Sequence, residues 1–208
     1  VTCDETILLP AGVDATRDNQ GFIMNRQKDT SSLNIPSVVS DADADSGSYV
    51  KLNGATTYDV DGGNFSFSFW IKWNPDGNAQ TIFGNSGEAW YKFLQLNSGG
   101  TALILEVDTN AHKAQGSFTA LTQGNWYHFT LVTVGDGSII IYKDGDTTGV
   151  TLAYVDFDND VTFDQIGIAR NDIYPCASQI DNILIYNKTL SAAEALRNYN
   201  AGKGSHRN

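Results

Sequence analysis

Two carboxylic acids stand two residues apart near the middle of the chain, at Glu106 and Asp108. In a β-strand this spacing places both side chains on one face. A retaining glycosidase needs two carboxyl groups about 5 Å apart, one as the acid and one as the nucleophile. The only other glutamates are Glu5, Glu88 and Glu194, so no further glutamate stands nearby. We therefore interpret the pair as solvated acids at a strand edge.

Other residues suggest lyase chemistry, which needs a group that neutralises a uronate carboxylate and a Tyr or His base. His112 and Lys113 follow soon after Glu106, and the chain has nine tyrosines. His128 belongs to the run Trp126-Tyr127-His128 of a predicted strand. We interpret His128 as a packed histidine and not as a catalyst.

Aromatic residues in polar loops favour glycan binding. Sugars stack their apolar faces on exposed rings, while amides and carboxylates bind the hydroxyl groups. One such loop is 84–91, and a second is 170–175, where an arginine could pair with an acidic sugar. The candidate ligand-binding residues are Glu88, Trp90, Tyr91, Arg170 and Tyr174. Ordinary packing is the alternative for the aromatic ones, and we assign Trp70, Trp73 and Trp126 to the core or the sheet surface.

Acidic groupings offer the hard oxygen ligands that Ca²⁺ prefers. They are Asp18 and Asn19 with Asp181, then Asp41, Asp43 and Asp45, and then Asp156, Asp158, Asp160 and Asp164. The second grouping is spaced like the start of a calcium loop, but Leu52 stands where an EF-hand has its closing Glu. A solvated acidic surface is the alternative for each, and the cofactor that we predict is a structural Ca²⁺.

Short strands must position these residues. The segment 65–73, FSFSFWIKW, alternates with period two and predicts a strand with one core face. The segment 124–145 predicts a β-hairpin turning at Gly135-Asp136-Gly137. Both faces of this hairpin are apolar, which places it in the middle of a sandwich. Further strands are predicted at 5–9, 21–25, 49–52, 81–84, 91–96, 102–108, 116–121, 150–157, 164–168 and 179–186.

One segment has the chemistry of a helix. Ser191 and Glu194 match a capping box, and the helix continues to Tyr199. Residues 202–208, GKGSHRN, have the composition of a linker or tail. We therefore predict one all-β domain over residues 1–201, a two-sheet antiparallel jelly-roll sandwich with one short C-terminal helix.

Composition limits the partners. The net charge is −11 over 208 residues, and such a field repels phosphate backbones, which argues against nucleic-acid binding. No run of about 18 apolar residues exists, so we expect no membrane insertion. The first residues lack a signal-peptide pattern, and we interpret them as a mature or excised start and not as a targeting peptide.

Two cysteines, Cys3 and Cys176, are compatible with one disulfide formed in an oxidising compartment. The chain-entropy model gives roughly 5 kcal/mol for so long a loop. Two unrelated buried thiols are the alternative, and we predict the disulfide.

Five motifs occur in a familiar order: 67–72 (FSFWIK), 124–128 (GNWYH), 141–145 (IYKDG), 166–167 (IG) and 179–191 (QIDNILIYNKTLS). Together they resemble the laminin G-like domains of the concanavalin A-like lectin/glucanase superfamily, in the bacterial, pentraxin-like form. The resemblance covers about Tyr49 to Tyr199. It implies two antiparallel sheets curved into a jelly roll, with the short helix packed after the last strand.

Members of this family are usually extracellular and non-catalytic and bind glycans or proteins, although some are glycoside hydrolases or polysaccharide lyases. The resemblance implies a calcium site that combines the first loop, here Asp18 and Asn19, with Asp181 near the chain's end. This sequence departs from the enzymes of the family. Asn110 stands where the glucanase signature has a third acid, and the paired Arg and the Gln-Ile-His element of the lyases are absent. The Asp-Asn of the pentraxins is also missing near Trp90.

We therefore predict a non-catalytic, lectin-like carbohydrate-binding module of a larger extracellular or cell-surface protein, with a glycan or polysaccharide as its partner. A protein-binding adhesion module is the first alternative, and a hydrolase or lyase on the same fold is the second. A flat apolar patch without a sugar-sized groove would indicate adhesion. Two close carboxylates, or a Tyr/His pair beside a basic residue in a deep cleft, would indicate an enzyme.

Overall fold

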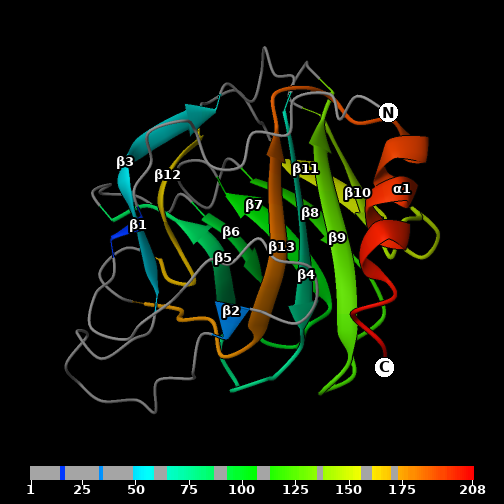
Figure 1. Cartoon of the computed structure of the whole chain (residues 1–208), viewed down its shortest axis with the longest axis horizontal. Helices are drawn as coiled ribbons and strands as arrows, with labels where there is room; N and C mark the ends of the chain where they lie inside the picture. Colours follow the sequence, from blue (N-terminus) through cyan, green and yellow to red (C-terminus); the bar gives the residue numbers. More distant parts are fainter. Residues whose placement is uncertain are drawn as a thin grey trace.

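The computed structural model describes residues 15–16, 33–34, 49–58, 65–86, 93–106, 113–134, 138–155, 161–169 and 173–208. Over these residues the chain forms two antiparallel sheets and one helix (Figure 1). The eight-stranded sheet contains, in spatial order, β1 (Ala15–Thr16), β3 (Val50–Tyr58), β12 (Val161–Ile166), β5 (Gln80–Gly84), β6 (Phe93–Leu96), β7 (Ala102–Glu106), β8 (Lys113–Ser117) and β11 (Thr151–Val155). The five-stranded sheet contains β10 (Ile139–Lys143), β9 (Trp126–Thr133), β4 (Ser66–Lys72), β13 (Gln179–Tyr186) and β2 (Leu33–Asn34). The predicted two-sheet sandwich is confirmed.

The hydrophobic core lies between the two sheets. β4 supplies Phe67, Phe69 and Ile71, each fully buried, as its period-two pattern predicts. The ring of Phe67 contacts Phe83 of β5 at 5.1 Å and Phe163 of β12 at 5.6 Å between centroids. These contacts join the five-stranded sheet to the eight-stranded sheet, whose β5, β6 and β7 lie behind β4 and β13 in Figure 1.

The hairpin formed by β9 and β10 lies at one edge of the five-stranded sheet, whereas its two apolar faces predict a place in the middle of the sandwich. Among the strands that the structure describes, β10 lies at the edge of its sheet and pairs with β9 alone. Its outer face is apolar because a second, smaller core lies under α1 (Ala192–Gly202). That core contains Val132, Tyr142, Tyr186, Leu190 and Ala195. A covering helix, and not a central position in the sheet, explains the two apolar faces.

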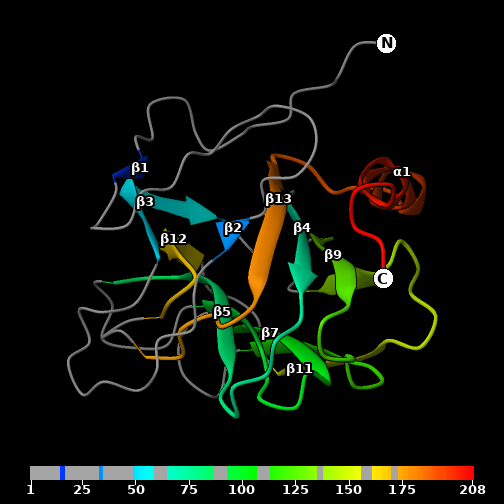
Figure 2. The same cartoon turned by 60° about the horizontal axis from the view of Figure 1, so that its bottom comes forward.

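The helix α1 begins with the predicted capping box. The Ser191 hydroxyl accepts from the Glu194 amide, and the Glu194 carboxylate accepts from the Ser191 amide at 2.9 Å. The Lys188 ammonium lies 2.6 Å from the same carboxylate, and these bonds lower the pKa of Glu194 to about 2. The helix lies to one side of β4 and β9 in the turned view (Figure 2).

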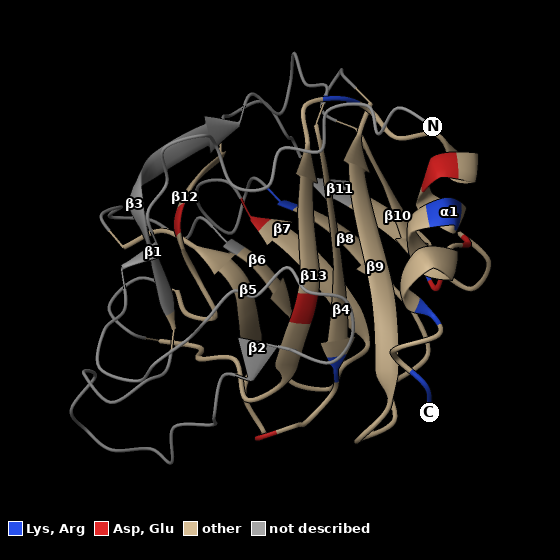
Figure 3. Cartoon of the chain, viewed as in Figure 1, with Lys and Arg blue, Asp and Glu red and all other residues tan. Residues whose placement is uncertain are grey.

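Other sequence expectations have mixed outcomes. The predicted strands at 5–9 and 21–25 lie outside the described residues, and the strand expected at 116–121 lies at 113–117. Charged side chains are sparse on the described strands, whereas α1 carries one acidic and one basic residue, Glu194 and Arg197, and the segment after it carries the basic residues Lys203 and Arg207 (Figure 3). Within the described residues, no helix is long and apolar enough to cross a membrane.

Candidate functional site

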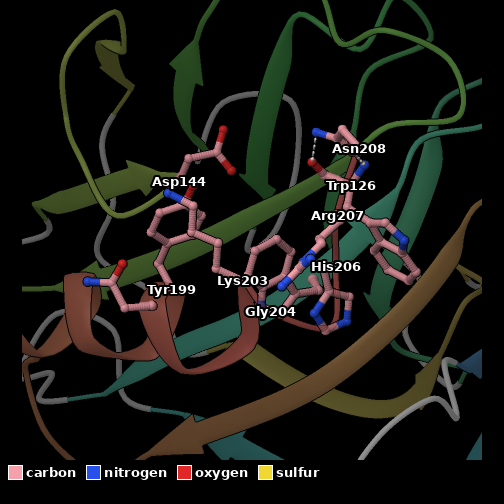
Figure 4. Close-up of a pocket in the computed structure, with 10 residues that line it drawn as sticks. Trp126, Asp144, Tyr199, Lys203, Gly204, His206, Arg207 and Asn208 are labelled. Carbon is pink, nitrogen blue, oxygen red and sulfur yellow. Dashed lines mark hydrogen bonds between the residues drawn. The ribbon is translucent and has the colours of Figure 1, made fainter.

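A pocket of about 630 Å³ lies where β4, β9 and the turn after β10 meet α1 and the C-terminal segment (Figure 4). Aromatic rings, amides and charged groups share its wall. The lining residues are Trp70, Trp126, Asp144, Tyr199, Asn200, Lys203, Gly204, His206, Arg207 and Asn208.

Trp126 is the first residue of β9, and the last residue of the chain holds its backbone. The Trp126 amide donates to Asn208 Oδ1 at 2.5 Å, and Asn208 Nδ2 donates to the Trp126 carbonyl at 3.2 Å (Figure 4). An asparagine amide offers one acceptor and two donors, so the Asn208 side chain pairs with the Trp126 backbone as the backbone of a neighbouring strand would. The Trp126 ring remains only half-buried beside the pocket.

Asp144 enters the pocket from the tight turn that follows β10. Its φ is 55° and that of Gly145 is 82°, a left-handed conformation that glycine adopts readily and that aspartate tolerates. The Asp144 Oδ1 accepts from the His128 amide at 2.9 Å. The Lys143 ammonium lies 3.6 Å from Oδ2. The carboxylate is thus held at the pocket by β9 and β10 together.

His206 fastens the C-terminal segment to the sheet. Its Nδ1 lies 2.8 Å from the Gly202 carbonyl, and its Nε2 lies 2.9 Å from Asp181 Oδ2. The two contacts hold the ring from opposite sides, one from α1 and one from β13. The ring is stacked on Trp70 with centroids 4.3 Å apart and planes at 7°.

The segment after residue 201 differs from its prediction as a linker. His206 is only 5% exposed and Gly202 is buried. A Cβ at Gly202 would lie 2.3 Å from Trp70 Nε1, so only glycine allows this approach. The sequence held one signal: Tyr199, Lys203 and Arg207 recur every four residues, which continues the helical period.

His128 lies under Trp70, with ring centroids 5.1 Å apart. Its Nε2 lies 2.9 Å from Ser68 Oγ, while its buried Nδ1 has no partner. Burial lowers the pKa of His128 to about 3, and the nearby His206 adds to this effect. His128 is therefore a neutral, packed residue, as interpreted from the sequence.

The pocket has the chemistry of a binding site. Trp126 and Tyr199 provide half-buried rings, and exposed Lys203, Arg207 and Asn208 provide hydrogen-bonding groups. The Lys203 ammonium lies 5.1 Å from the centroid of the Tyr199 ring. Asp144 is the only carboxylate among the lining residues, so the paired acids of a glycosidase are missing from this wall.

Comparison with known proteins identifies the fold. Residues 44–195 match a laminin G family described as the concanavalin A-like lectin/glucanases superfamily. The chain belongs to this family. A search of curated proteins found no match.

Part of this laminin G-like domain is similar to solved structures of binding domains. The binding domain of Paraclostridial Mosquitocidal Protein 1 is 16% identical, with a TM-score of 0.50, and the match covers 76% of this chain and 42% of that one. The botulinum neurotoxin serotype D binding domain is 22% identical, with a TM-score of 0.48 and coverage of 74% and 40%. The serotype G binding domain is 18% identical, with a TM-score of 0.46 and coverage of 74% and 40%. The match thus spans less than half of each of these chains.

The ligand-binding residues predicted for this laminin G-like domain lie away from the pocket or outside the described residues. Glu88, Trp90, Tyr91 and Arg170 are outside. Tyr174 is half-buried with a φ of 53°, and its carbonyl accepts from the Thr81 amide at 3.0 Å. Tyr174 does not line the pocket. Sequence reasoning missed the pocket because it assigned Trp126 to the sheet and the last residues to a linker.

The predicted calcium ligands lie mostly outside the described residues, which exclude Asp18, Asn19, Asp41, Asp43 and Asp45. Asp181 is described, and its two oxygens accept from His206 Nε2 at 2.9 Å and from the Asn182 amide at 2.7 Å. No group of three or more His, Cys, Asp or Glu suited to a metal occurs among the residues that the structure describes. Calcium stays a prediction.

The predicted disulfide also stays untested, because Cys3 lies outside the described residues. Cys176 has no disulfide partner among the residues whose positions are described. Its sulfur lies 3.6 Å from both Gln80 Oε1 and the Ser178 carbonyl. Burial raises the pKa of the Cys176 thiol to about 12.

The interpretation of Glu106 as a solvated acid is wrong. Glu106 is the last residue of β7 and is only 4% exposed. Burial raises its pKa, and the neighbouring Lys113 partly offsets that effect. Asp108 lies outside the described residues, so the structure gives no second carboxylate for the pair.

Proposed function

We propose that this laminin G-like domain is a non-catalytic carbohydrate-binding module of a larger extracellular or cell-surface protein. The pocket between β9, α1 and the C-terminal segment carries this proposal. Its volume of about 630 Å³ lies in the range of small-molecule sites. Half-buried rings beside polar groups are what a sugar requires, since its C–H faces stack while its hydroxyl groups hydrogen-bond.

Protein adhesion through a flat apolar surface is less well supported. Among the described residues, only Val134 and Leu196 are large, apolar and exposed. Single exposed apolar residues are normal on any protein surface. A pocket with a mixed polar and aromatic wall therefore favours a small polar ligand over an apolar protein face.

The charges around the pocket extend the proposal to acidic sugars. Lys203 and Arg207 outnumber Asp144 there, although the whole chain carries a net charge of −11. Because the two basic side chains are exposed, they can reach a carboxylate or sulfate on a ligand. Neutral sugars would use Asp144 and Asn208 instead.

A polysaccharide screen with the Trp126→Ala variant tests this proposal. Retention on immobilised polysaccharides and release of oligosaccharides are both measured. Loss of one aromatic stack costs about 1 kcal/mol, so we expect affinity to fall at least several-fold. Val134→Ala, at the other end of the β9 segment and 41% exposed, is the matched control and should bind normally.

Arg207→Ala is a second pocket variant that should fold normally, because this exposed side chain can be removed without disturbing the core. It should weaken binding to uronate or sulfate polymers and leave the melting temperature unchanged. Unchanged affinity in both pocket variants would refute the site. Oligosaccharide release would refute the non-catalytic assignment, and no retention on any polymer would contradict carbohydrate binding.

A further inference from the structure

The C-terminal segment, residues 203–208, supplies half of the pocket wall. Five of the ten lining residues belong to it: Lys203, Gly204, His206, Arg207 and Asn208. The segment thus carries both basic side chains and the asparagine amide of the pocket. Whatever holds this segment against the sheet therefore also decides whether the pocket is complete.

A single buried side chain fixes the segment to the rest of the protein. His206 is 5% exposed, whereas the other five residues of the segment are exposed. Its ring is stacked on Trp70 and meets Trp126 edge-on, with centroids 4.5 Å apart in the second contact (Figure 4). Because the free energy of local opening depends on buried contacts, a segment with one buried side chain has low local stability.

Asp181 of β13 holds the His206 ring from the side of the sheet. Asp181 Oδ2 lies 2.9 Å from His206 Nε2, while Asp181 Oδ1 accepts from the Asn182 amide at 2.7 Å. The Asp181 side chain is 18% exposed, and it is not among the residues that line the pocket. Asp181 therefore acts on a bound ligand through His206 and not by contact.

The backbone takes a left-handed conformation at two places near these contacts. Asn182 has a φ of 48°, and it lies where the register of β13 against β4 shifts between Asp181 and Leu184. Such irregularities redirect side chains. Asp144, with a φ of 55°, lines the pocket itself. Residues other than glycine seldom adopt this conformation, and where they do they gather at functional sites.

We propose that Asp181 and His206 are positioning residues that latch the C-terminal segment, and that closure of this latch is coupled to ligand binding. When the latch is open, the pocket loses Lys203 and Arg207, and the Trp126 backbone loses both of its bonds to Asn208. A ligand that contacts these groups binds the closed state better, so it shifts the segment toward closure. The coupling rests on the proposed function, whereas the latch does not.

Amide hydrogen exchange tests the latch in the absence of any ligand. The Trp126 amide donates to Asn208 Oδ1, so its exchange rate reports how often the segment leaves the sheet. His206→Ala and Asp181→Ala should each raise this rate at least tenfold. The amides of β4, in the middle of the same sheet, should exchange as before, which separates latch opening from unfolding.

Two further variants serve as controls for the exchange measurement. Asp181→Asn should behave almost normally, because its amide still offers a partner to both the Asn182 amide and the His206 ring. Ser205→Ala changes an exposed residue of the same segment that does not line the pocket. It should leave the exchange of the Trp126 amide unchanged.

The coupling is measured with polygalacturonate and dextran sulfate, whose acidic groups suit Lys203 and Arg207. In each variant the affinity should fall by the same factor as the closed fraction that the exchange rates give. A saturating polymer should slow exchange of the Trp126 amide in the unmodified protein and restore its protection in Asp181→Ala. A residue with a purely structural role would not show this restoration.

The outcomes separate the latch from the proposed function. Unchanged Trp126 exchange in both alanine variants would overturn the latch and leave the proposed function standing. Affinities that do not follow the closed fraction would overturn the coupling. If the unmodified protein binds neither polymer, the coupling fails together with the proposal of acidic ligands, while the exchange rates still decide whether Asp181 and His206 hold the segment.

Discussion

His128 should make the domain lose stability in mild acid, and His128→Gln should remove this loss. The ring is 2% exposed, and its pKa is lowered from 6.5 to about 3, first by burial and then by His206. In the unfolded chain the same ring takes up a proton near pH 6.5. Between these two values the unfolded state binds more protons than the folded state, so stability falls as the pH falls.

The two pKa values set the magnitude. Each pH unit between them is worth about 1.36 kcal/mol, so the interval from 6.5 to about 3 gives an upper limit of about 5 kcal/mol for His128. At pH 5.0 the expected loss is about 2 kcal/mol. Above pH 7 the residue contributes no pH dependence, because its ring is neutral in both states.

Urea unfolding at half-unit steps from pH 8.0 to pH 4.0 measures this loss. Glutamine is neutral throughout, so the difference in unfolding free energy between the unmodified protein and His128→Gln isolates the histidine from the acids. Glu194 also loses its stabilising bonds in acid, since its pKa is lowered to about 2, but it does so in both proteins. The difference should change by about 1 kcal/mol or more per pH unit below pH 6. Parallel curves for the two proteins would refute the neutral, buried state of His128.

Two further predictions concern the metal and the cysteines. If one of the acidic groupings holds a structural Ca²⁺, addition of EDTA should lower the melting temperature by several degrees. The reason is that a ligand at 100 times its Kd stabilises the folded protein by about 2.7 kcal/mol. Magnesium serves as the control ion, and an unchanged melting temperature in EDTA would argue against bound calcium. If Cys3 and Cys176 form a disulfide, the unreduced protein in denaturant should show no reactive thiol, and the reduced protein should show two. Two reactive thiols in the absence of reductant would exclude the disulfide. Denaturant is needed because burial raises the pKa of Cys176 to about 12, which keeps a free thiol there unreactive in the folded chain.

Local patterns predicted the strands and the helix because their causes are local. The alternation of Phe67, Phe69 and Ile71 determines which face of β4 is buried, whatever the rest of the chain does. The Ser191 and Glu194 side chains bond to each other's amides within one helical turn. Such signals depend on residues within a few positions, and both were confirmed.

The neighbours of the hairpin could not be predicted in the same way. Apolar residues on both faces of β9 and β10 require cover on both faces, but a second sheet and a helix provide equal cover. The helix that lies there begins about fifty residues later in the sequence. Only the packing of Tyr142 with Leu190 and Ala195 decides between the two.

The pocket was missed for a related reason. Glycine, lysine and asparagine in residues 202–208 have the composition of a flexible segment. Their position depends on one residue, His206, whose Nε2 lies 2.9 Å from Asp181 Oδ2 and whose ring is stacked on Trp70. Neither partner can be recognised from the composition of the segment, since both lie on strands more than twenty residues away.

The residues that line the pocket are largely different from the residues that form the core of the sandwich. The sandwich core lies between the sheets and contains none of the last seven residues, yet five of them line the pocket. Substitutions at Lys203, Arg207 and Asn208 can therefore change the ligand while the two sheets stay as they are. Family members with the same sandwich can differ in what they bind here, which is why membership in the family fixes the fold and leaves the ligand to be established at the site.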